Sequence, residues 1–151
     1  MAANREAVRD AVATLLEDGL TGTGNPVQAV YNHQVGDFAG QSPVVVVSSA
    51  GSGRPAMTFS GNRATFWLNV HVFVLYSDEG DWGEDDAEDR LDLIEADIAG
   101  IVDTNRGPTD DWQKLGYGER MSGAGRSQTG AVVVGGLEYR TELIPLQAEV
   151  F

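Results

Sequence analysis

The chain has 151 residues, 42% of them hydrophobic, which is enough for one compact domain with its own core. It has no cysteine, so disulfides, thiolate zinc sites and a cysteine nucleophile are all excluded. The formal net charge is -13, and with nine arginines and one lysine the chain is a poor candidate for a reader of free duplex DNA, which needs a basic patch to neutralise phosphates.

The N-terminal segment predicts a short amphipathic helix. Asn4 can serve as its N-cap, apolar residues recur at helical spacing between Val8 and Leu16, and Gly19 follows where a left-handed C-terminal cap would lie. The charges in this segment are unlike the apolar core of a secretory signal, and no apolar run in the chain approaches the length that spans a bilayer. We therefore expect no membrane partner.

Two strands and a long connection are expected next. Residues 27–31 follow a Gly/Pro/Asn turn and suggest a first strand, and the β-branched run 43–47, with a proline at its start, suggests a central one. Residues 48–62 then indicate a long arm or a wide hairpin loop, with Arg54 and Arg63 near its ends.

The second half of the chain has clearer periodicity. Residues 65–76 alternate so that one face is wholly apolar and should lie on the core. A helical stripe follows, running to about Asp103, and residues 112–130 look irregular. Residues 132–151 predict a hairpin around a two-glycine turn, whose second strand has an edge-type interruption at Pro145.

These elements predict the fold class. We expect an α+β protein with a single, mostly antiparallel β-sheet of four to five strands packed against two helices, forming one domain over residues 1–151.

The acidity is concentrated in one region. Residues 78–111 contain fourteen Asp or Glu against two arginines, while the rest of the chain is almost balanced. Several of these acids fall in the first turns of the second expected helix, where carboxylates interact favourably with unpaired backbone N–H groups. Their number exceeds what capping needs, so an interaction surface is the functional hypothesis and a solvated helix face the simpler one.

The sequence contains only weak matches to motifs for catalysis or metal binding. An EF-hand register started at Asp81 fails because Gly83 and Asp86 stand at its third and sixth positions, which leaves only a loose divalent site as an alternative. The two histidines, His33 and His71, lack a nucleophile or a second ligand at a useful spacing, so packing or hydrogen bonding is the better interpretation. The sequence therefore predicts no enzyme, no catalytic or metal-binding residues and no cofactor.

Four segments together carry a resemblance to a known class of protein. They are VYNHQVGDFAGQSPVVVVSS, TFWLNVHVFVLYSD, EDRLDLIEADIAGIV and VGGLEYRTELIPLQAEVF. In order and size they look like small tail-completion proteins of long-tailed bacteriophages, in particular tail terminators. The resemblance covers most of the chain as a pattern of elements, and no residue-level site transfers with it.

The resemblance implies a role and partners. Such a protein would form a hexameric homo-oligomer, a ring that caps the head-proximal end of the tail tube, ends tube polymerisation and joins the tail to the neck. Its partners would be the tail tube protein and neck or connector proteins, with genome DNA passing through the lumen without specific binding. It would lie in the tail and neck region of the virion and assemble in the host cytoplasm.

The expected interaction surfaces rest on charge. Arg54 and Arg63 could pair across subunits or with the tube, and the acidic stretch could face the lumen or a basic partner. An exposed terminal strand could add to a ring interface. The alternatives are a head-completion or neck ring and a small metal- or ligand-binding α+β protein. The candidate interaction residues are Arg54, Arg63, Trp82, Glu84, Asp85, Asp86 and Asp89.

Overall fold

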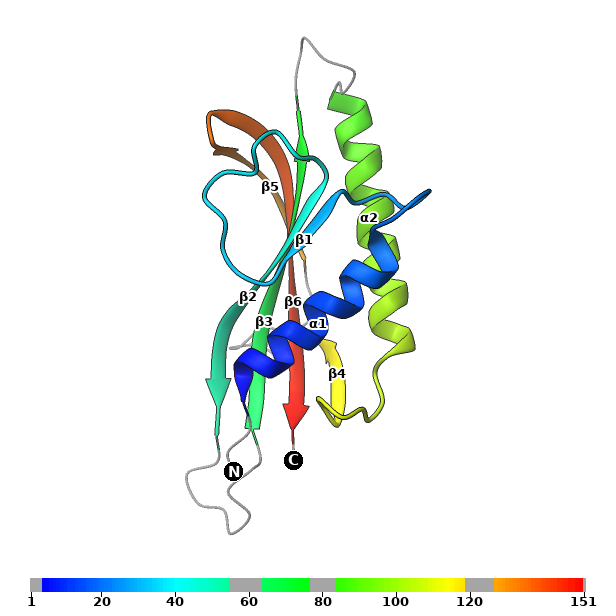
Figure 1. Cartoon of the computed structure of the whole chain (residues 1–151), viewed down its shortest axis with the longest axis vertical. Coiled ribbons are helices and arrows are strands. Elements are labelled where there is room, and N and C mark those ends of the chain that lie inside the picture. Colours follow the sequence, from blue (N-terminus) through cyan, green and yellow to red (C-terminus); the bar gives the residue numbers. More distant parts are fainter. Residues whose placement is uncertain (1–3, 55–63, 77–83, 119–126, 151) are drawn as a thin grey trace.

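The computed structural model describes residues 4–54, 64–76, 84–118 and 127–150 (Figure 1). These residues form two helices and six strands, in the order α1 (Arg5–Leu20), β1 (Ala29–Tyr31), β2 (Val44–Gly53), β3 (Ala64–Leu75), α2 (Glu84–Thr104), β4 (Lys114–Tyr117), β5 (Gln128–Val134) and β6 (Leu137–Val150).

The strands form a single sheet. Its order is β1-β2-β3-β6-β4, and β5 also pairs with β6. Only the short pair β1–β2 is parallel among the described strands, so the expected α+β class and mostly antiparallel sheet are confirmed. The sheet has six strands because Lys114–Tyr117, within a segment expected to be irregular, pairs with β6 as β4.

Both helices cover one face of the sheet (Figure 1). The expected core face of β3 is confirmed, since its side chains at alternate positions from Phe66 to Val74 are all 0% exposed. The apolar stripe of α2 packs on them through Leu91, Ile94 and Ile98, each worth roughly 1.5 to 3 kcal/mol. That contribution exceeds the roughly 0.2 to 0.5 kcal/mol lost to each like-charge pair at the start of the helix.

Helix α1 begins as expected and ends differently. The Asn4 side chain accepts hydrogen bonds from the backbone N–H groups of Glu6 and Ala7. Gly19, expected as a left-handed cap, lies inside the helix, and the C-cap is Thr21 in an extended conformation. A Cβ at Gly19 would lie 2.6 Å from Cδ1 of Ile101, so this glycine gives α2 room to approach.

Strand β2 is longer than expected. Residues 48–53, assigned in the sequence analysis to an arm or loop, continue the strand and pair with β3 after a register shift between Ser49 and Gly51. That part of the expectation was wrong, because small Ser and Gly residues continue the strand next to a strong partner. The rest of the expected arm, residues 55–62, lies outside the described residues.

Strand β6 is central in the sheet, which corrects the expectation of an exposed terminal strand. It pairs with β3 on one side and with β5 and β4 in turn on the other. Pro145 is tolerated because its carbonyl faces Gly118, whose N–H donates to it at 3.2 Å. Its missing N–H therefore falls in the gap between β5 and β4, where no strand partner is needed.

The other face of the sheet has a smaller core. Phe38, from the loop between β1 and β2, is 2% exposed, and its ring centroid lies 4.8 Å from that of Phe73 and 5.5 Å from that of Tyr139. The loop therefore covers one part of this face. This second cluster was not predicted from the sequence.

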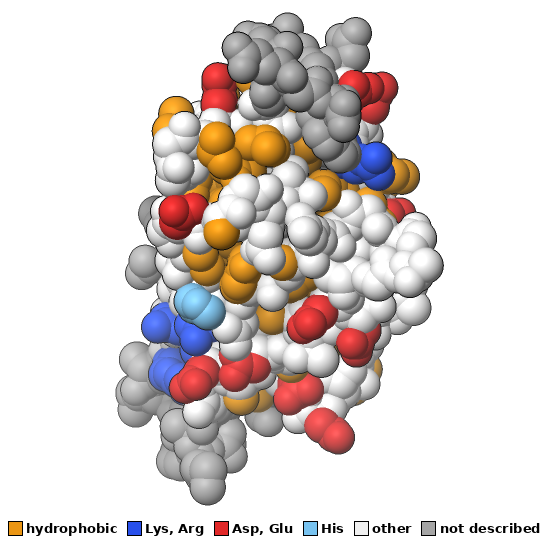
Figure 2. Space-filling view, turned by 45° about the horizontal axis from the view of Figure 1, so that its top comes forward, with side chains coloured by type: hydrophobic (Ala, Val, Ile, Leu, Met, Phe, Trp, Pro, Cys, Tyr) orange, Lys and Arg blue, Asp and Glu red, His pale blue; other side chains and the backbone are white. Residues whose placement is uncertain are grey.

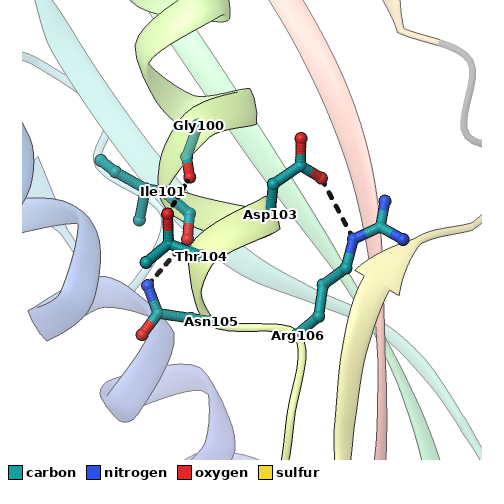
Figure 3. A network of polar contacts seen from close by, with 6 residues as sticks. All are labelled: Gly100, Ile101, Asp103, Thr104, Asn105 and Arg106. Atoms are coloured by element: carbon teal, nitrogen blue, oxygen red, sulfur yellow. Dashed lines mark hydrogen bonds and ion pairs between the residues drawn. The ribbon is translucent and has the colours of Figure 1, made fainter.

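Side chains cap the C-terminal end of α2 (Figure 3). The Thr104 hydroxyl donates to the carbonyl of Gly100 at 2.8 Å, and the Asn105 amide donates to that of Ile101 at 2.7 Å. Arg106 and Asp103 form an exposed ion pair at 3.1 Å. The Asn105 side chain thereby satisfies the carbonyl of Ile101, because the Asn105 backbone N–H donates to Val102 instead.

Candidate functional site

The structure does not bring the predicted interaction residues together. Arg54 follows β2, and its guanidinium carbon lies 5.3 Å from the centre of the Phe66 ring. Asp86 and Asp89 are exposed on the first turns of α2. In Figure 1, β2 ends toward one end of the long axis and α2 begins toward the other. The arginine and the acids therefore belong to different surfaces of one molecule.

The remaining candidates cannot be placed in full. Glu84 and Asp85 belong to the first turn of α2, as expected, while their side chains lie outside the described part of the structure. Arg63 and Trp82 also lie outside the described residues.

The acidic surface extends further along α2 than the predicted residues. Glu88 and Asp92 are exposed beside Asp89. Beneath them, Glu142 on β6 is only 5% exposed, and burial raises the pKa of its carboxyl group. The negative charges of Glu95, Asp92 and Glu88 add to this pKa rise, against a hydrogen bond with Ser127 that lowers it. The carboxylates of α2 thus act on the buried acid of the sheet below.

The β5–β6 hairpin presents apolar side chains to solvent. Its two-residue turn was correctly predicted, with Gly135 and Gly136 at φ 59° and 81°. Val132, Val133 and Leu137 are 38%, 67% and 40% exposed, with Val133 on the sheet face opposite to the other two, and we call these three residues at the edge of the sheet the hairpin patch. Among the described strands, β5 pairs with β6 alone, and it has no charged residue or proline, the usual protection of an edge strand.

The described loop leaves part of the second sheet face uncovered. Trp67 and His71 are half-buried there, and the Trp67 ring N–H donates to the Gln147 side-chain oxygen at 3.3 Å. The His71 ring lies 4.2 Å from the Phe73 ring, centre to centre, and burial lowers the pKa of His71. A neutral, partly packed histidine matches the packing role expected from the sequence.

Shallow hollows lie beside the helices. One of about 690 Å³ is lined by α1 and α2 near Gly19 and Ile101, and another of about 470 Å³ lies between α1 and Trp112. Within the described ranges, no three His, Asp or Glu side chains converge in a way that could hold a metal ion. The described helices include none that is both long and apolar enough to cross a membrane.

Comparison with known proteins gives no relative for this chain, because neither the family models nor the curated proteins that were searched match it.

Sequence reasoning missed two features of the surface. It predicted the hairpin as structure without assigning a role to its valines, although three consecutive valines beside two glycines and no charge were the available signal. It also gave no role to Arg5 and Arg9, whose side chains reach serines of β2, because their register against β2 depends on tertiary packing.

Proposed function

We propose that this chain is a virion structural protein of the tail-terminator type. It forms a six-membered ring at the head-proximal end of the tail tube of a long-tailed bacteriophage, stops tube polymerisation and joins the tail to the neck. The observation that carries the proposal is the hairpin patch on an unprotected edge strand, in a chain whose sequence segments resemble tail terminators in order and size.

The hairpin patch suits assembly between copies. A row of unpaired backbone groups next to exposed valines favours contact with another chain and is hazardous when left open. A closed ring buries such a patch on every subunit through a repeated heterologous interface. We therefore assign the hairpin patch to one side of the subunit interface.

The acidic surface of α2 suits a channel that DNA crosses. Exposed carboxylates along the first turns repel phosphates and give the genome no place to bind. In this proposal the part of that surface that meets no neighbouring subunit faces the lumen, and the tail tube and neck proteins contact the two flat sides of the ring.

Electron microscopy of particles made without this chain tests the role. We expect tail tubes of uncontrolled, excessive length that do not join heads, with normal length restored when the wild-type chain is supplied from a plasmid. Tails of uniform normal length beside unattached heads would instead assign the chain to the neck ring and overturn the terminator role.

A further inference from the structure

Three arginines gather where α1 begins and β2 ends. Arg5 and Arg9 stand one helical turn apart, and their guanidinium groups donate to the hydroxyls of Ser52 at 3.0 Å and Ser49 at 3.1 Å. Arg54 follows two residues after Ser52 and lies over the Phe66 ring. We call Arg5, Arg9 and Arg54 the basic patch. Basic atoms gather at the lower left of Figure 2, with acidic atoms directly beside them.

Nearby carboxylates do not neutralise the α1 arginines. Arg5 and Arg9 donate to uncharged hydroxyls among the described residues. The Nε atom of Arg9 is buried with no hydrogen-bond partner. Glu6 and Asp10 stand about 100° further round the helix, and Asp10 accepts a hydrogen bond from Asn32. The two α1 arginines therefore add positive charge to this end of a chain whose net charge is -13.

The strongest negative surface lies at the other end of the molecule. Glu88, Asp89 and Asp92 are exposed on the early turns of α2, and Arg90 is the one base in that helix. Figure 1 places the start of α2 and the start of α1 toward opposite ends of the long axis. One copy thus carries opposite charges at its two ends.

We infer that the basic patch of one copy receives the acidic first turns of α2 from a second copy. The contact is head to tail, so it is heterologous and can repeat around a closed ring. This inference rests on the proposed ring assembly and specifies which charged surfaces of neighbouring copies meet. Opposite charges at an interface steer association and set its register, and rim charges act chiefly on the association rate and its salt dependence.

Exchanging the charges tests the contact. Arg5→Glu/Arg54→Glu reverses exposed members of the basic patch, and Glu88→Arg/Asp89→Arg reverses exposed members of the acidic surface. Sedimentation velocity over a wide concentration range, at low and high salt, measures assembly, and circular dichroism checks folding. Arg106→Glu/Lys114→Glu is the matched control for the first exchange, because it makes the same change in net charge at exposed bases elsewhere.

We expect each exchange to raise the apparent dissociation constant by about tenfold or more at low salt. An equimolar mixture of the two exchanged variants should restore assembly, because each then supplies the charge that the other needs. The control should assemble like the wild type.

Two outcomes separate the inference from the proposed function. Rings that form equally well from the wild type and both exchanged variants would overturn this contact and leave the proposed ring intact, as would a mixture without recovery when each variant alone is impaired. A wild type that stays monomeric under all these conditions would overturn both.

Discussion

Glu142 is a buried acid beneath an acidic helix. Burial raises the pKa of its carboxyl group, and the charges of Glu95, Asp92 and Glu88 raise it further. Because the pKa in the folded chain is above that in the unfolded chain, the stabilising contribution is complete below the unfolded pKa. It is lost as the pH rises through the folded pKa. Ionised Glu142 therefore opposes folding at neutral pH.

Glu142→Gln should accordingly raise the free energy of unfolding at neutral pH. The amide keeps an acceptor for Ser127 and removes the charge that faces α2. Urea unfolding at several pH values measures the effect, which should shrink in acid, where the wild-type carboxyl is protonated. Glu149→Gln, half-exposed on the same strand, is the control. A wild type that is more stable than Glu142→Gln at neutral pH would contradict this view of the buried charge.

At the scale of elements, sequence periodicity predicted the helices and strands whose apolar side chains pack in the core. The apolar face of β3, the stripe of α2 and the glycine turn before β6 all have strong local signals, and all three are confirmed. Strand β4 was missed because its four residues are too few to show the alternation of apolar and polar residues that marks a strand. They form a strand only by pairing with β6. Phe38 was missed for the same kind of reason, since its burial depends on Phe73 and Tyr139 across the sheet.

The two helices give a prediction about their packing. Gly100 is exposed, and a Cβ there would meet nothing within 4 Å, so Gly100→Ala should stabilise the chain by about 0.8 to 1.0 kcal/mol through helix propensity alone. Gly19→Ala gains the same propensity but pushes Ile101, whose Cδ1 atom would be 2.6 Å from the new methyl group. Chemical unfolding of both variants should show a clearly smaller gain at Gly19, and equal gains would show that the helices do not press together there.

At the scale of the whole molecule, composition predicted the acidic region but not the basic patch at the other end of the molecule. The acidic stretch is contiguous in sequence and could be counted. The basic patch joins residues 5, 9 and 54, which only the packing of α1 on β2 brings together. For the same reason the sequence could suggest Arg54 as an interaction residue but not its neighbours. The hairpin patch needed knowledge of which side of β5 is left unpaired.

Self-assembly through the hairpin patch is the central claim, and native mass spectrometry with negative-stain imaging tests it most directly. The purified wild type should form a closed ring of six with a central hole. Val133→Lys should remain folded and shift toward monomer, since it places a charge on the most exposed apolar side chain of the patch. Leu93→Lys, at an exposed leucine on α2, should still form rings. A wild-type monomer at every concentration, or rings that survive Val133→Lys unchanged, would contradict the claim.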